Sequence, residues 1–351
     1  MRTGMASQRD VARRARVSFM TVSRVINKHP SVRPETRERV LRAIKDLAYY
    51  PNAAARALNS SRSHNVGIIF PRRDYLLVAP FCVELCAEVE AQLRRRGYHL
   101  FLGSTAEERE SGDLYTLFKE GKVDGMIVFA PARDDPRIAR LAGDHLPFVV
   151  VHGRSRRGEF SYVDSDNSRG MALLLEYLFE LGHRRIGFVT GSLAEVNSQD
   201  RLRRYRRELR LRGLTLEDAL VCLGDWTLES GYAGFRKLME NPRPPTAICF
   251  SNDQMAIGAL KAAHDLGLGV PRDVSITGYD DIKYASFTAP ALTTVRQHIG
   301  EVGDKVAELL LERMEARSRE PRRIILEPEL VVRESCHAIR PFRKEEWNRN
   351  R

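Results

Sequence analysis

Seven short apolar runs between residues 65 and 281, separated by stretches with helical character, constrain the fold of this chain most strongly. Short apolar runs bounded by turn residues predict strands buried on both faces, as in parallel sheets. Strands that alternate with helices predict βαβ units. The runs fall into two groups and predict two α/β lobes. The first lobe holds NVGIIFP, YHLFLGST, DGMIVFAP and PFVVVHG, and the second holds RIGFVTG, AICFSND and VSITGYDD.

The chain has 351 residues, 43% of them hydrophobic, which exceeds one ordinary core and predicts two or three domains. No run of about 18 uncharged apolar residues occurs, and the N-terminus lacks a secretory leader. We therefore expect a cytoplasmic protein with no membrane partner. The five cysteines show no CxxC spacing, which argues against a disulfide framework and a zinc site, so no metal or cofactor is expected. They are Cys82, Cys86, Cys222, Cys249 and Cys336.

Positive charge is concentrated at the N-terminus. Residues 1 to 65 contain 14 Lys and Arg against four Asp and Glu, a net charge of +10 out of +11 for the whole chain. A basic head on a nearly neutral body is typical of a nucleic-acid-binding module attached to a domain of another kind. A solvated basic tail is the alternative, but the head has helical periodicity, which a tail would lack.

The head shows the apolar spacing of three short helices, and Pro34 suits the first turn of the third. Three helices of this length can bury one small core. The positions expected in that core are Val11, Ala12, Ala15, Val22, Val25, Ile26, Val40, Leu41, Ile44, Leu47 and Ala48.

The second helix, with Ser18 as its expected N-cap, leaves Phe19, Met20, Ser23 and Arg24 facing outward near its start. This is the arrangement of a helix-turn-helix recognition helix in a major groove. An arginine donates two parallel hydrogen bonds to guanine, and apolar side chains contact thymine methyls. The alternative, with Phe19 and Met20 packed inside, stays open from the sequence. The residues interpreted as phosphate ligands are Ser18, Thr21, Ser23, Asn27 and Thr36.

Residues 10 to 58, DVARRARVSFMTVSRVINKHPSVRPETRERVLRAIKDLAYYPNAAARAL, resemble the start of the lactose-repressor (LacI/GalR) family of bacterial transcription regulators. SNDQMAIGAL, DVSITGYDD and LTTVRQ are similar to later signatures of that family, in the same order. The resemblance covers nearly the whole chain. Two positions depart from it: Arg16 stands where the family usually has Gly or Asn, and Arg204 where Gly is frequent.

The resemblance assigns roles to residues in the head and in the segment after it. The base-reading positions of the family correspond to Phe19, Met20 and Arg24. Residues 52 to 62 match the hinge helix, which pairs with its dimer mate in the minor groove. Ala55 and Leu58 match the minor-groove contacts, and Leu58 matches the leucine that opens a base step. A flexible linker with an incidental leucine is the alternative.

Polar side chains follow several of the predicted strands, where ligands bind in such folds. Arg201 offers a bidentate fork, and Trp226 offers an aromatic platform. In the resembled family the matching positions line the effector site between the lobes. Asp166 and Asp280 could instead cap the helices that follow them. The expected effector-binding residues are Asp166, Arg201, Trp226, Asn252 and Asp280.

We expect a helix-turn-helix domain at 1–51, a hinge at 52–62, a two-lobed core at 63–338 and a charged tail at 339–351. The N-lobe would hold about 63–164 plus 292–322, and the C-lobe about 165–291 plus 323–338. We expect the core to have a fold like that of periplasmic binding proteins, with two parallel-sheet, Rossmann-like lobes.

The expected function is that of a bacterial, nucleoid-associated repressor that binds a pseudo-palindromic operator in double-stranded DNA as a homodimer. A small effector in the cleft, a sugar, sugar phosphate or nucleoside-like molecule, would switch it. The alternative is a solute-binding protein with the same core and no DNA role. GLGVPR lacks the third glycine of a dinucleotide fingerprint, and the sequence has no GxSxG, HExxH or Walker loop, so an enzyme is not expected.

Overall fold

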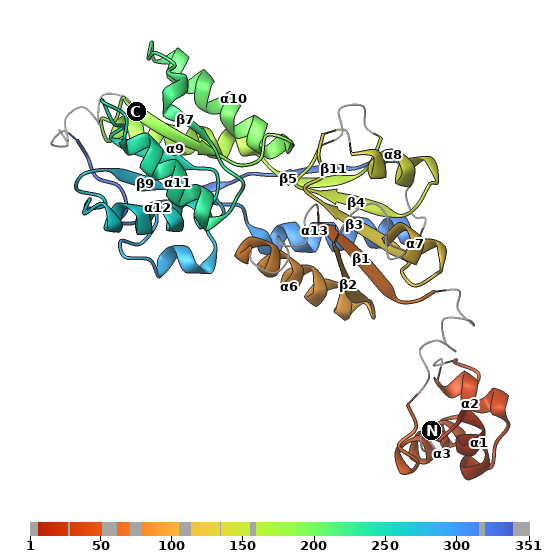
Figure 1. Ribbon diagram of the computed structural model, residues 1–351. Coiled ribbons are helices and arrows are strands. Elements are labelled where there is room, and N and C mark those ends of the chain that lie inside the picture. Colours follow the sequence, from red (N-terminus) through yellow and green to blue (C-terminus); the bar gives the residue numbers. More distant parts are fainter. Residues whose placement is uncertain are drawn as a thin grey trace, which may run out of the picture. The chain divides into compact units, whose positions relative to one another are not determined.

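The computed structural model describes residues 6–26, 29–50, 62–70, 79–104, 114–133, 135–154, 159–315 and 320–339. The contacts divide the chain into two units, Met1–His64 and Asn65–Arg351. Figure 1 shows the helices and strands of each unit. Among the described residues, no helix is both long enough and apolar enough to cross a membrane.

The first unit is a three-helix head made of α1 (Gln8–Ala15), α2 (Phe19–Ile26) and α3 (Pro34–Asp46). The expected inward face is confirmed for the first two helices, whose residues Val11, Ala15, Val22 and Val25 are buried. Two expectations for the third helix are wrong. Leu41 is exposed because it lies one residue past the buried face, and Ala48 is exposed because α3 has already ended.

The second unit begins with a six-stranded parallel sheet in the order β11-β5-β4-β3-β1-β2. Alternate residues of its strands point to opposite faces. One face packs on α6 and α13, and the other packs on α7 and α8. The elements of this N-lobe are β1 (Asn65–Phe70), α6 (Pro80–Arg95), β2 (His99–Ser104), α7 (Leu114–Lys119), β3 (Gly125–Phe129), α8 (Pro136–Gly143), β4 (Phe148–Val151), β5 (Tyr162–Ser165), α13 (Ile299–Met314) and β11 (Arg323–Leu326).

The C-lobe is built on a four-stranded parallel sheet in the order β7-β6-β8-β9. Helices α11 and α12 cover one face, and α9 and α10 cover the other. Its elements are α9 (Asn167–Glu180), β6 (Ile186–Thr190), α10 (Val196–Leu211), the 3-10 turn η1 (Asp218–Leu220), β7 (Val221–Leu223), α11 (Leu228–Met239), β8 (Ala247–Phe250), α12 (Asp253–Asp265), β9 (Ser275–Thr277) and the 3-10 turn η2 (Lys283–Ser286). All seven predicted strands form, so the predicted two-lobed α/β core is confirmed.

Three chain crossings join the lobes, and two lie later than expected. The first falls between β5 and α9, next to the expected position near 164. The second follows β10 (Thr294–Arg296), because bridges Thr277–Thr293 and Asp280–Arg296 hold that segment to the C-lobe. The third follows β11, which pairs with β5 in the N-lobe sheet, and precedes β12 (Glu329–Val331), which pairs with β10. Residues 323–326 therefore belong to the N-lobe, against the expectation.

Candidate functional site

Helix α2 presents its first residues to solvent. Phe19 and Met20 are 51% and 59% exposed, while Val22 and Val25 on the opposite face are 0% and 3% exposed. Arg24, one turn after Met20, is also exposed. The alternative in which Phe19 and Met20 pack inside is therefore wrong, and the three expected base-reading side chains share an accessible stretch of one helix.

Three of the expected phosphate ligands, Ser18, Thr21 and Ser23, lie at the start of or on the same helix, and Thr36 lies on α3. The Ser18 hydroxyl caps α2, accepting a hydrogen bond from the Thr21 N–H at 3.1 Å, and the two hydroxyls are 2.8 Å apart. Ser23 and Thr36 are half-buried. The predicted positions that lie outside the described residues are Asn27, Ala55 and Leu58.

A cavity lies where the carboxyl ends of the strands of both lobes meet. Four of the five expected effector residues line it. This is the place where open α/β folds bind ligands. The residues that line the cavity are Ala79, Phe81, Cys82, Phe129, Ala130, His152, Glu195, Asn197, Arg201, Trp226, Asn252, Asp280 and Gln297.

Arg201 of α10 is 2% exposed and is held by the protein. Its Nε donates to Asn167 Oδ1 at 2.8 Å, and Nη1 donates to the Ser251 carbonyl. The guanidinium lies 3.5 Å from the centre of the Tyr279 ring, a cation–π contact. Two of its three nitrogens are thus used within the C-lobe, and the group is rigidly placed at the cavity wall.

Trp226 forms another part of the wall. Its indole Nε1 donates to Glu195 Oε1 at 3.0 Å, and its carbonyl accepts from Asn252 Nδ2 at 3.0 Å. Asn252 Oδ1 also caps α12 by accepting the Met255 N–H at 2.8 Å. Both amide atoms of Asn252 are therefore engaged, and its main effect is to position Trp226.

Asp280 lies in the cavity wall and accepts a hydrogen bond from Gln297 Nε2 at 2.6 Å. Burial raises the pKa of its carboxyl to about 7, although Arg201 and Gln297 act in the opposite direction. Burial and the charge of Asp280 also raise the pKa of Asp253. Asp280 caps no helix among the described residues, so the alternative role considered for it does not apply.

Asp166 does not line the cavity. It is the N-cap of α9, and its Oδ1 accepts the Arg169 N–H at 2.9 Å. Helix α9 starts directly after β5, and the Asp166 carboxylate therefore accepts a hydrogen bond from a backbone N–H of the first turn of the helix. The predicted effector role of Asp166 is therefore corrected to helix capping. Arg204, which stands where the resembled family frequently has Gly, pairs with Glu208 at 2.7 Å on its own helix.

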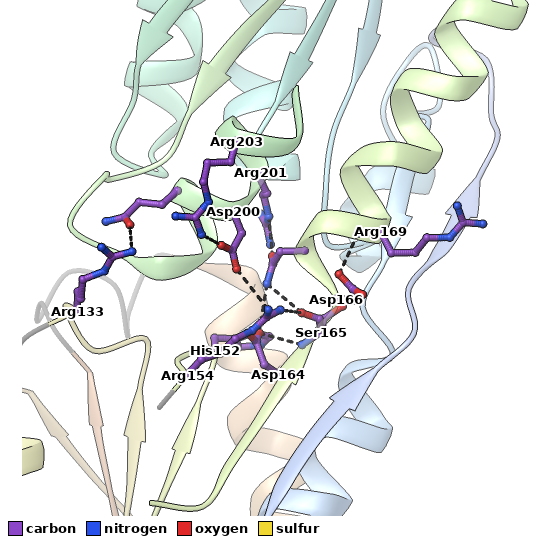
Figure 2. Close-up of polar contacts among 12 residues, drawn as sticks. Arg133, His152, Arg154, Asp164, Ser165, Asp166, Arg169, Asp200, Arg201 and Arg203 are labelled. Atoms are coloured by element: carbon purple, nitrogen blue, oxygen red, sulfur yellow. Dashed lines mark hydrogen bonds and ion pairs between the residues drawn. The ribbon is translucent and has the colours of Figure 1, made fainter. Parts of the chain in front are cut away.

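The sequence analysis missed His152, which directly follows β4 and lines the cavity. The sequence already contained the signal for His152, because this residue is also a polar side chain that directly follows a predicted strand. Its Nδ1 lies 3.3 Å from Oδ1 of Asp164, which is fully buried. Burial by itself raises the pKa of Asp164, but His152 and Arg154 outweigh that effect and lower it. Figure 2 shows this group between the lobes.

Arg154 extends the group across the cleft. Its Nε donates to Asp164 Oδ2 at 2.7 Å, and its Nη1 lies 3.5 Å from Asp200 of α10. Nearby, Arg133 donates to Gln199 Oε1 at 2.6 Å. These contacts join the N-lobe to the C-lobe, and Arg133, Arg154 and Asp200 line a second hollow beside them.

Comparisons with known proteins agree with this geometry. The family model "Bacterial regulatory proteins, lacI family" matches residues 8–52, and "Periplasmic binding protein-like domain" matches residues 175–336. The HTH-type transcriptional repressor PurR of Escherichia coli O139:H28 (strain E24377A / ETEC) is 35% identical over 342 residues, 97% of this chain and 99% of that protein.

Two solved structures are similar over almost the whole chain. The transcriptional regulator CelR–cellobiose complex is 34% identical, with a TM-score of 0.71, over 94% of this chain and 99% of that one. The lac repressor dimer bound to operator and the anti-inducer ONPF is 27% identical, with a TM-score of 0.84, over 95% of this chain and 100% of that one.

A basic three-helix head joined to a two-lobed core with an interlobe cavity defines a DNA-binding transcriptional regulator that a small effector switches. The chain belongs to the lacI family of bacterial regulatory proteins. It is not an enzyme, and the match of the head disfavours a solute-binding protein.

Proposed function

We propose that this chain represses transcription by binding a pseudo-palindromic operator as a homodimer, with α2 of each subunit in the major groove. The observation that carries the proposal is the exposure of Phe19 and Met20 beside Arg24 on a helix whose other face is buried. Large apolar side chains held in solvent are expected where a partner covers them. The lac repressor dimer bound to operator provides the precedent. Ala55 and Leu58 are proposed for the minor groove.

Exposed apolar side chains on the core support dimerisation. Phe101 and Leu102 of β2 are 51% and 54% exposed, and Tyr284 and Phe287 at η2 are 60% and 85% exposed. Such residues are typical of surfaces that another subunit covers.

The effector is proposed to bind in the interlobe cavity, and the CelR–cellobiose complex, one of the similar solved structures, is the precedent for a regulator with a small bound molecule. A ligand that contacts both lobes stabilises their closed arrangement, and linkage then requires DNA and ligand to affect each other's affinity. No cofactor is needed for this role. The proposed place of action is the bacterial cytoplasm, at the nucleoid.

Selection of binding sites from random DNA tests the DNA-reading role. Arg24→Ala should lower operator affinity by about 1 to 3 kcal/mol and relax one position in each half-site, because a guanine loses its bidentate partner. Arg42→Ala on the exposed side of α3 is the matched control and should leave the preferred sequence unchanged. An unchanged preference in Arg24→Ala would refute the assignment of α2.

A further inference from the structure

We propose that the outward face of α10, in the C-lobe, is a second DNA-contacting surface, which binds the phosphate backbone of duplex DNA through Arg203, Arg207 and Arg210. This surface lies on the core, apart from the helix-turn-helix head, and it reads no sequence. It gives the core a way to hold a stretch of DNA in addition to the site that the head binds.

Helix α10 concentrates positive charge on a core that is otherwise close to neutral. Its 16 residues contain six arginines, no lysine and two acidic residues, a net charge of +4. The chain beyond residue 65 has a net charge of only +1, so the rest of the core is slightly negative. The positive charge of α10 is therefore a local feature of this helix.

Three of the arginines form a row on the side of α10 that faces solvent. Arg203, Arg207 and Arg210 are all exposed, and their spacing of four and three residues places them on one face of the helix. The opposite face, with Tyr205 and Leu209, is buried in the C-lobe core. Helix α10 lies on the outside of the C-lobe, over the face of the sheet away from α11 and α12 (Figure 1). The row is thus accessible to a partner.

The carboxylates that contact α10 do not neutralise this row. Each of them is shared with, or taken by, another arginine. The pairs are Asp200 with Arg154 and Arg203, Glu208 with Arg204 and Arg212, and Asp218 with Arg206. Arg207 and Arg210 have no acidic partner in the part of the chain that the structure describes. Like charges one turn apart destabilise a helix, so such a row is expected where a bound polyanion supplies the opposite charge.

The chemistry of the row fits a phosphate backbone. Arginine presents a planar fork that binds phosphate oxygens through two parallel hydrogen bonds. The row spans about 10 Å along the helix axis, at about 1.5 Å per residue, and each DNA strand carries one phosphate per about 3.4 Å of its axis. Three long arginine side chains can therefore meet two or three consecutive phosphates of one strand.

An acidic protein is a less suitable partner for this face. Protein interfaces are built around buried aromatic and apolar anchors. Within α10, all of which the structure describes, the one large apolar side chain that is exposed is Leu211. A single exposed leucine is ordinary for a protein surface and does not make an apolar centre.

The test places a photo-crosslinker on α10 of the full chain, so that contact with DNA is read at this surface and not at the head. Leu211→Cys is labelled with benzophenone-maleimide and irradiated with a fluorescent duplex of random sequence, about 40 base pairs long so that it exceeds the span of the row several-fold. Ala233→Cys, at an exposed position of α11, is the matched control. We expect at least tenfold more cross-linked DNA from the label on α10, and a steep loss of the product as salt increases.

Charge variants identify the groups that bind the DNA. In the Leu211→Cys chain, Arg207→Gln with Arg210→Gln should lower the yield of cross-linked DNA about tenfold, because two phosphate contacts are lost. Arg236→Gln with Lys237→Gln removes two exposed charges from α11 and should leave the yield unchanged. Arg207→Lys with Arg210→Lys keeps the charge without the fork and should give an intermediate yield.

Equal cross-linking from α10 and α11, or a yield that Arg207→Gln with Arg210→Gln leaves unchanged, would overturn the inference. So would displacement of the labelled duplex from α10 by poly-glutamate more effectively than by unlabelled duplex of equal charge, since the partner would then be an acidic protein. The operator role of α2 is tested separately, because the random duplex offers no selected site and the label reports on α10 alone.

Discussion

Trp226 illustrates how single residues shape the cavity. Its backbone has φ 74°, a left-handed conformation that costs a non-glycine residue energy, and its ring lies over Gly191. A Cβ on Gly191 would come within 2.3 Å of the indole. Because Gly191 has no side chain, the indole of Trp226 can pack against it and form the aromatic part of the cavity wall.

We predict that Gly191→Ala displaces the Trp226 ring, because the indole is the flexible partner in that clash. The emission of Trp226, measured with Trp347→Phe, should shift to longer wavelength, and binding to the cavity should weaken about tenfold or more. Gly143→Ala, where no atom lies within 4 Å of the added carbon, is the control. An unchanged emission spectrum would contradict the packing described here.

Asp280 should make the unliganded core sensitive to pH. Burial raises its pKa to about 7, whereas the unfolded chain titrates near the ordinary value of 3.8. Between these values the folded state holds a proton that the unfolded state has lost. The stabilising effect of this proton is fully present below pH 3.8 and is lost as pH rises through about 7.

Asp280→Asn cannot ionise, so its free energy of unfolding relative to the unsubstituted protein should rise as pH increases from about 4 to 7 and then stay level. Urea unfolding at several pH values measures the difference. Asp265→Asn is a control of opposite sign, because a hydrogen bond from Lys261 lowers the pKa of Asp265. A difference for Asp280→Asn that does not vary with pH would refute the buried-carboxyl explanation.

At the scale of elements, the turn between α1 and α2 sets where the recognition helix begins. Arg16 adopts φ 51° and ψ 49°, and its N–H bonds the Arg13 carbonyl while the Val17 N–H bonds the Ala12 carbonyl. These are the bonds of a Schellman motif, which favours glycine at the left-handed position. The departure of Arg16 from the family pattern is therefore accommodated without a change of turn.

Arg16→Gly should stabilise the head by about 1 kcal/mol, since it removes the Cβ penalty of the left-handed conformation. Arg16→Ala retains that penalty and is the control for loss of the guanidinium. Hydrogen exchange of the buried amides of α1 and α3 follows the stability of the head. Equal protection in both variants would show that the turn is not strained.

At the scale of the whole core, a few polar contacts join the two lobes beside the hollow that Arg133, Arg154 and Asp200 line. The Arg154–Asp200 pair crosses the cleft, and the Arg133 N–H donates to the Ala194 carbonyl at 3.3 Å beside it. Both ionic side chains are mostly buried, at 24% and 11% exposed, so the pair is screened less than a surface pair.

Asp200→Asn should favour opening of the lobes and speed amide exchange at Arg133 several-fold, with no change in β6, and a bound ligand should restore the protection. The control is Asp218→Asn, which removes the 98% exposed partner of Arg206 on the same helix as Asp200. Faster exchange in both variants, or in β6 as well, would mean general destabilisation and not opening.

The sequence by itself determined the three helices of the head, the seven apolar strands and four of the residues that line the cavity, because local periodicity and strand ends encode them. Only the tertiary structure decided which short segments complete the sheets. β5, YVDS, has too few apolar residues to show a buried run, and β11 joins it from 158 residues later in the chain, a pairing set by non-local hydrogen bonds. The same holds at the cavity, where Asp166 and His152 both follow strands. A helix that starts at Asn167 takes the carboxylate of Asp166 as its cap, whereas the ring of His152 contacts the buried Asp164 and lines the cavity.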